Sequence, residues 1–238
     1  MAISQVGSFT LPTTAANPGV GITPTGAAAG DVLLFFVGWY VQNGATITPP
    51  IGATLVPNTR VDHVGTNDDS TTAVYMLILT GAPASTYTFS VSPAPTYGVG
   101  VSTLCLRGAD PTAPIDVGAG APTGNSGYST APTALGLTTT VANEYLCLFR
   151  LGDITDLTAP FPGFTTLAVT GGFDHSYATS TGYWGFYVKS GQAQGATGNL
   201  VATETIDDWN ISLIAVVPPL SVTPNYTPGT DAIFFGMM

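Results

Sequence analysis

The sequence predicts an all-β protein, a jelly-roll-like β-sandwich built from two sequence-similar halves. Three observations lead to this prediction. Turn-forming residues are frequent, with 29 Gly and 19 Pro among 238 residues, and breakers at that density leave little room for helices. The apolar fraction of 45% argues against a disordered chain. Finally, several landmarks recur along the sequence at a nearly constant spacing.

The stretch from Gly30 to Tyr40 is the clearest strand in the sequence. It reads Gly-Asp-Val-Leu-Leu-Phe-Phe-Val-Gly-Trp-Tyr, and such an apolar run without polar alternation is typical of a strand that is covered on both faces. Residues 143–149, Asn-Glu-Tyr-Leu-Cys-Leu-Phe, again join an acidic residue to a short apolar run. This similarity suggests that the chain contains two related halves.

The other strands are expected in chain order around these two runs. A loop rich in Thr, Ala, Gly and Pro precedes Gly30, and Pro49-Pro50 marks a turn because proline cannot donate into a ladder. The stretch from Gly108 to Ala142 is interpreted as a connector with one strand at 135–141. In the first half we expect further strands over residues 3–11, 53–64, 72–79, 87–92 and 99–107.

The repeat is seen in four landmarks at spacings of 110 to 113 residues. The aligned pairs are Leu34 with Cys147, residues 50–52 with 161–163, Gly81 with Gly191, and residues 103–106 with 213–216. A half of four or five strands leaves one face uncovered, so two halves are expected to pack sheet on sheet. The predicted organisation is a single β-sandwich domain over residues 1–219, with halves at about 30–108 and 143–217, a connector at 109–142, and a C-terminal extension at 220–238.

Charge is sparse and mostly negative, with 4 Lys and Arg against 14 Asp and Glu and a net charge of −10. Four scattered cations cannot supply the basic surface that nucleic acid requires, so no nucleic-acid partner is expected. The longest apolar run, residues 32–41, is about half of a membrane span, and no membrane partner is expected. The N-terminus has no basic region followed by an apolar stretch, so we expect a soluble chain without a secretion signal.

Each of the two cysteines lies inside an apolar strand run. Cys105 and Cys147 are interpreted as buried free thiols, and a disulfide between neighbouring strands is the alternative. No Cys-x-x-Cys or Cys/His cluster indicates zinc or redox chemistry.

The two histidines occur in matching dipeptides, Asp62-His63 and Asp174-His175, which are 112 residues apart. Neighbours in a strand point to opposite faces of the sheet, which favours structural positions over a metal or pH-sensing site. Two further acidic groups, residues 67–69 and Asp207-Asp208, are expected at turns, where Asx-turn capping is favoured over calcium binding.

No motif indicates an enzyme. The sequence has no Gly-x-Ser-x-Gly elbow, no phosphate-binding Gly-Lys-Ser/Thr and no His-Glu-x-x-His, and nothing pairs two of its carboxylates as a glycosidase would need. We therefore predict a non-enzymatic protein with no catalytic residues, no cofactor and no metal.

Aromatic residues are the remaining candidates for ligand contact. Trp39 and Trp184 are expected to be packing residues. Tyr97, Tyr128 and Tyr177 lie in expected loops, where an aromatic face could stack on a sugar ring.

A series of short motifs along the chain resembles a known family. The motifs are residues 30–34 (Gly-Asp-Val-Leu-Leu), 47–55 (Ile-Thr-Pro-Pro-Ile-Gly-Ala-Thr-Leu), 73–75 (Ala-Val-Tyr), 85–90 (Ser-Thr-Tyr-Thr-Phe-Ser), 106–110 (Leu-Arg-Gly-Ala-Asp) and 114–116 (Pro-Ile-Asp). Together they resemble a β-sandwich domain of structural proteins of tailed bacteriophages and prophages, over roughly residues 25–218. The chain departs at Ala53, where the family often has Trp, and at Leu106, where it usually has Tyr.

The resemblance implies a virion protein on the particle surface, assembled in the host cytoplasm, with other virion proteins and copies of itself as partners. A head decoration or spike subunit is favoured because the chain has no heptad segment of the kind that extends a fibre shaft. The alternative is a tail-fibre or carbohydrate-binding adhesion module that recognises a host-surface glycan.

The C-terminal extension ends in an apolar cluster. Its residues Ile233, Phe234, Phe235, Met237 and Met238 are costly to leave in water, at about 25 cal/mol per Å². We predict that they dock onto a neighbouring subunit; docking back onto their own sandwich is the alternative.

Overall fold

The computed structural model describes residues 2–11, 17–40, 44–65, 69–95, 98–118, 122–152, 157–174 and 181–219. Within these ranges the chain forms strands, turns and loops and no helix, which confirms the all-β prediction. None of the described residues therefore belongs to a helix long and apolar enough to cross a membrane. The strands are β1 (Ser4–Gln5), β2 (Gly19–Ile22), β3 (Val32–Tyr40), β4 (Thr46–Thr48), β5 (Thr54–Leu55), β6 (Val61–His63), β7 (Ser70–Ile78), β8 (Thr86–Ser92), β9 (Gly100–Arg107), β10 (Thr123–Ser129), β11 (Thr133–Ala134), β12 (Thr138–Thr139), β13 (Glu144–Gly152), β14 (Thr165–Asp174), β15 (Thr181–Gln192), β16 (Gly195–Ala196), β17 (Leu200–Val201) and β18 (Asp207–Val216).

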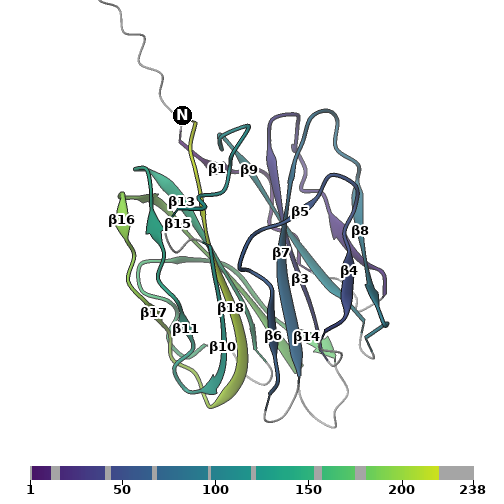
Figure 1. The fold of residues 1–238 in the computed structure, drawn as a ribbon, viewed down its shortest axis with the longest axis vertical. Helices are drawn as coiled ribbons and strands as arrows, with labels where there is room; N and C mark the ends of the chain where they lie inside the picture. Colours follow the sequence, from purple (N-terminus) through teal and green to yellow (C-terminus); the bar gives the residue numbers. More distant parts are fainter. Residues whose placement is uncertain are drawn as a thin grey trace, which may run out of the picture.

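Two antiparallel main sheets face each other (Figure 1). The first main sheet has the order β1-β9-β3-β7-β5, with β6 also paired to β7. The second main sheet has the order β10-β18-β13-β15-β14. One hydrophobic cluster draws on both, with Leu34 and Phe36 from β3 against Cys147, Phe149 and others from the second sheet. This arrangement is consistent with a β-sandwich.

The central strand β3 is buried at all nine positions, as its uninterrupted apolar run predicts. Alternate side chains point to opposite faces of a strand. Phe36 thus packs in the core between the main sheets, whereas Phe35 contacts Phe89 of β8 on the outer face, with ring centroids 5.2 Å apart. The expected packing roles of Trp39 and Trp184 are confirmed, since both side chains are buried.

Smaller sheets cover the outer faces of both main sheets. The three-stranded sheet β2-β8-β4 lies over the first main sheet, and residues from β11, β17 and the neighbouring loops pack on the second. In β8 the buried residues Phe89 and Val91 alternate with exposed ones, as predicted for a half-buried strand.

The central strands of the two main sheets begin with the same local geometry. Gly30 and Asn143 have positive φ angles of 88° and 65°. The carboxylates of Asp31 and Glu144 each accept a hydrogen bond from the backbone N–H three residues earlier, at 2.8 Å and 3.0 Å. The strand order relative to the chain is also the same, because β9-β3-β7-β5 corresponds to β18-β13-β15-β14.

Several expected boundaries are wrong. The connector holds β10, β11 and β12 in place of one strand at 135–141. The loop before Gly30 contains β2, and the strand expected over 53–64 divides into β5 and β6. In each case a short segment gains its strand pairing from a distant partner, such as β18 for β10, which local sequence does not reveal.

The cysteines are buried free thiols, as predicted. Cys147 lies in the core between the main sheets, and Cys105 lies on the outer face of the first main sheet. Their positions on different sheet faces explain why they do not form a disulfide.

Candidate functional site

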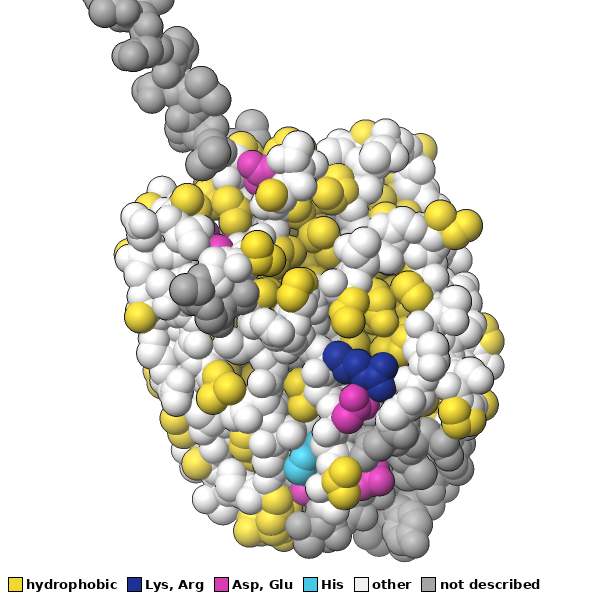
Figure 2. All heavy atoms as spheres, viewed as in Figure 1, with side chains coloured by type: hydrophobic (Ala, Val, Ile, Leu, Met, Phe, Trp, Pro, Cys, Tyr) yellow, Lys and Arg dark blue, Asp and Glu magenta, His cyan; other side chains and the backbone are white. Residues whose placement is uncertain are grey.

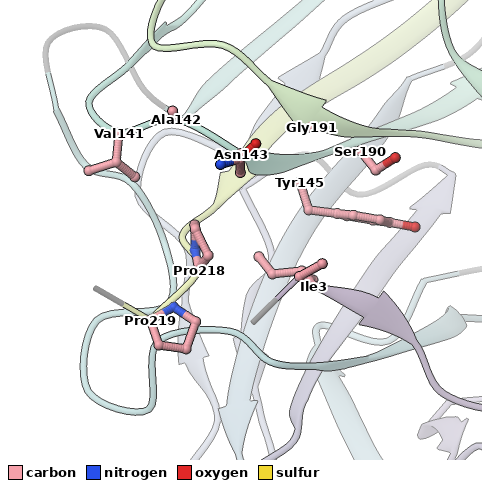
Figure 3. Close-up of a pocket in the computed structure, with 10 residues that line it drawn as sticks. Ile3, Val141, Ala142, Asn143, Tyr145, Ser190, Gly191, Pro218 and Pro219 are labelled. Atoms are coloured by element: carbon pink, nitrogen blue, oxygen red, sulfur yellow. The ribbon is translucent and has the colours of Figure 1, made fainter. Parts of the chain in front are cut away.

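An apolar groove of about 720 Å³ opens at the end of the main sheets where both ends of the described chain meet. Its lining residues are Ala2, Ile3, Val141, Ala142, Asn143, Tyr145, Ser190, Gly191, Pro218 and Pro219. In Figure 3, Pro218 and Pro219 lie on one side of this groove and Ser190 and Gly191 on the other. Hydrophobic side chains also gather at this end of the molecule in the space-filling view (Figure 2).

The walls of the groove are strand ends and tight turns. The turn before β13 closes through a hydrogen bond from the Asn143 backbone N–H to the Gln192 carbonyl, 2.8 Å. Gly191 adopts a φ of +67°, in the left-handed region that favours glycine. β18 stops at Val216, and Pro218-Pro219 cannot donate backbone hydrogen bonds to extend the ladder. The groove is therefore built on rigid strand ends.

The floor of the groove is the end of the hydrophobic core. Ile3 and Tyr145 line the groove and also belong to the cluster between the main sheets, and each is 7% exposed. Burial raises the pKa of the Tyr145 hydroxyl above its ordinary value. An apolar side chain that enters this groove would extend the existing core.

Two acidic side chains bond the backbone of the turn that forms one wall of the groove. Glu144, between the lining residues Asn143 and Tyr145, is fully buried, and Asp116 is 4% exposed. One Glu144 oxygen accepts backbone N–H bonds from Thr140 and Val141, at 3.1 Å and 3.0 Å. Asp116 accepts a bond from the Thr140 N–H at 2.6 Å. Both carboxyl groups thus hold the turn that leads into β13.

The two carboxyl groups have opposite pKa shifts. Burial raises the pKa of Glu144 to about 7, and its hydrogen bond to Asp116 and the charge of Asp116 act in the same direction. Burial also opposes ionisation of Asp116, but hydrogen bonds from the Gly118 N–H, Glu144 and Thr140 outweigh it and lower the pKa of Asp116. The pair therefore holds one proton on Glu144 at mildly acidic pH.

The predicted Asp62-His63 pair divides between two faces, as expected for strand neighbours. Asp62 bonds Arg60 and Thr71, whereas His63 Nε2 lies 2.9 Å from Asp208 Oδ1 of the second main sheet. The matching residue His175 lies outside the described residues, so the second pair stays a prediction. Within the described ranges no group of three or more His, Cys, Asp or Glu could hold a metal ion.

The expectation that Asp207-Asp208 caps an exposed turn is wrong. Both residues belong to β18 and are buried. Each carboxylate has a partner, a histidine or an arginine, that compensates for its burial. Asp208 contacts His63, and Asp207 Oδ2 lies 3.3 Å from the Arg150 guanidinium, which also bonds Glu204. For the group at 67–69, Asn67 and Asp68 lie outside the described residues.

Of the tyrosines expected to face a ligand, Tyr128 is described. Its side chain on β10 is 41% exposed, so it is open to contact, but the groove residues do not include it. Tyr97 and Tyr177 lie outside the described residues. The docking residues Ile233, Phe234, Phe235, Met237 and Met238 also lie outside them.

Sequence reasoning missed the buried ionic groups. Arg150 is 1% exposed within the apolar run of β13, and a lone cation in such a run was the available signal. The acidic residue before the second core strand was noticed, but its partner Asp116 comes from a turn 28 residues earlier.

The sequence matches no known protein-family model and no curated protein, and the structure matches no solved structure.

Proposed function

We propose that this chain is a non-enzymatic structural protein of a tailed-phage virion, a head decoration or spike subunit held by contacts with other virion proteins and copies of itself. It would assemble in the host cytoplasm and face outward on the particle. The proposal comes from the sequence motifs, and the positions of their residues support it.

The observation that carries the proposal is that residues of two motifs bond each other at the start of β3. Asp31 of the first motif receives two bonds from the Arg107 guanidinium of a later motif, at 2.8 Å and 2.7 Å. Asp116 of the last motif accepts a hydrogen bond from the Thr140 N–H, which lies outside the motifs. Pro50-Ile51-Gly52 forms a tight turn in which the Ala53 N–H bonds the Pro50 carbonyl. The residues that resemble the phage family thus include groups with a structural role, which supports the assignment as a particle subunit.

The finer architecture is part of the same proposal: the two main sheets are related halves of a duplicated unit. The shared strand order and the matching starts of β3 and β13 support this. A second match comes from the turns at Gly52 and Gly163, both at positive φ and both closed by a bond to the carbonyl two residues before the glycine. The jelly-roll-like connection of the strands and the single domain over residues 1–219 stay predictions.

Immunogold labelling of phage particles with antibodies raised against the purified protein tests the virion assignment. Gold on intact, density-purified particles is expected, and the position of the label distinguishes head from tail. Label confined to the particle-free host fraction contradicts the proposal. Particles denatured before labelling serve as the control for epitopes hidden in the assembly.

The second candidate, a glycan-binding adhesion module, is favoured by the exposed Tyr128 side chain alone. A glycan array probed with the wild-type protein and with Tyr128→Ala tests it, and Val117→Ala, at a residue 65% exposed, is the matched control. Glycan binding that Tyr128→Ala removes and Val117→Ala leaves intact would replace the decoration assignment.

A further inference from the structure

We propose that the apolar groove of one copy receives residues 232–238 of a second copy. The inference rests on the proposed function, because it identifies the self-contact by which such subunits would hold together. Residues 232–238 read Ala-Ile-Phe-Phe-Gly-Met-Met. They supply the apolar, aromatic and thioether side chains that an apolar groove selects.

The groove has the size and chemistry of a side-chain receptor. Its volume of about 720 Å³ lies within the range of about 300–1,000 Å³ that is usual for ligand sites. Its floor is formed by the core residues Ile3 and Tyr145. Two inserted phenylalanines would each bury about 150–250 Å², so the gain comes from the same hydrophobic effect that closes the core.

The position of the extension identifies the occupant as a segment of this chain. Pro218 and Pro219 form part of the groove wall, and the extension follows them directly. In every copy the extension therefore starts at the rim of a groove, and the apolar cluster follows twelve residues later. A tethered ligand has a high effective concentration near neighbouring grooves when copies gather on a particle.

The sequence of the spacer favours a second copy over the same copy. Residues 220–231 contain Pro224 and Pro228. Proline locks φ and biases the residue before it towards extended backbone. Twelve residues in an extended conformation would span at most about 37 Å, at about 3.1 Å per residue. That length is sufficient for the apolar cluster to reach the groove of a neighbouring copy. Each copy offers this groove and one extension, so the contact can close into a ring or continue as a chain.

Two full-length variants with complementary defects test the exchange. Ala142→Trp fills the groove at an exposed lining residue, and the double variant Phe234→Ser/Phe235→Ser disables the extension. Sedimentation velocity should show concentration-dependent oligomers for the wild type and monomers for each variant alone. An equimolar mixture of the two variants should recover dimers, because the intact extension of one fits the intact groove of the other. Ala131→Trp, at an exposed turn outside the groove, is the matched control and should oligomerise as the wild type does.

The outcomes separate this inference from the virion assignment. A mixture that stays monomeric overturns the exchange, whether or not gold labels the particle. A monomeric wild type whose extension becomes protease-sensitive on Ala142→Trp would place the extension in its own groove, and this too overturns the proposal. Thermal melting checks that each variant folds. If Ala142→Trp does not fold, Ser190→Trp on the opposite wall replaces it as the groove variant.

Discussion

Replacing Glu144 by Gln should abolish a pH dependence of stability that the wild-type protein has. The pKa of Glu144 is raised from 4.5 to about 7 by burial and by Asp116. The unfolded chain therefore releases this proton at lower pH than the folded protein does. Stability from this group is fully present below about pH 4.5 and is lost as the pH rises through about 7.

The magnitude follows from the two pKa values. One unit of pKa corresponds to about 1.4 kcal/mol, so the change from 4.5 to about 7 is worth at most about 3.5 kcal/mol. Between about pH 5 and pH 8 we expect the wild-type free energy of unfolding to fall by about 2 to 3 kcal/mol. The lowered pKa of Asp116 acts in the opposite direction, but only as the pH falls through its own acidic range.

Urea denaturation at several pH values between about 5 and 8 measures this slope. Gln has the shape of protonated Glu and keeps the oxygen that accepts the Thr140 and Val141 N–H groups. The variant should match the wild type near pH 5 and exceed it near pH 8. Asp116→Asn, which removes the neighbouring charge, should give a shallower slope than the wild type. Parallel pH profiles for Glu144→Gln and the wild type would refute the reasoning.

Three further predictions concern charge and burial. Arg150→Met leaves two buried carboxylates without their cation and should lower the free energy of unfolding by about 3 to 5 kcal/mol. The control Arg60→Met, at a solvent-exposed pair, should lower it by less than about 1 kcal/mol. Equal losses for the two variants in urea denaturation would contradict this prediction. Arg107→Gln deprives the buried Asp31 of its bidentate partner and should lower the melting temperature; thermal melting that matches the wild type would count against it. Both thiols are buried and have raised pKa values, so a thiol-specific reagent should react only as the protein unfolds, and rapid labelling of the native protein would disprove that burial protects them.

The sequence predicted the buried strands well because their apolar runs carry the signal locally. β3 is buried along its whole length, as its composition requires. β10 gives no such signal, since it reads Thr-Gly-Asn-Ser-Gly-Tyr-Ser. It is a strand because glycines allow close approach: an added Cβ at Gly124 would lie 2.6 Å from the Asn58 carbonyl oxygen, and one at Gly127 would meet the Trp209 ring at 2.8 Å. Such contacts depend on tertiary structure.

The candidate groove could not be predicted for a related reason. Its walls come from residues 2–3, 141–145, 190–191 and 218–219, which only the folded sheets bring together. Sequence reasoning did anticipate that the apolar extension needs a receptor, because exposed apolar surface is costly whatever the fold. The apolar composition of residues 232–238 is readable locally, but the groove that we propose as their receptor is not.

Asp31 and Glu144 precede or begin the central strands of the two main sheets, but their electrostatic surroundings differ. Each acid lies at the start of a central strand. In the first sheet Val32 pairs with Leu106, and one step further along this register places Arg107 opposite Asp31. In the second sheet Tyr145 pairs with Val216, and the same step places Val217 opposite Glu144. The first acid therefore has a cation partner and a lowered pKa. The second has an apolar neighbour and a second carboxylate, which explains why it keeps its proton.

Val217→Arg should convert the second arrangement into the first. The Val217 backbone already bonds Asp110 and Pro114, and its side chain is half-buried, so the substitution leaves the ladder intact. A guanidinium there would stabilise ionised Glu144, lower its pKa and flatten the pH profile of unfolding. Adding Glu144→Gln should remove the gain at pH 8, since the new cation would lose its ionised partner. A Val217→Arg profile as steep as that of the wild type would contradict the inference that the lack of a cation at this position raises the pKa of Glu144.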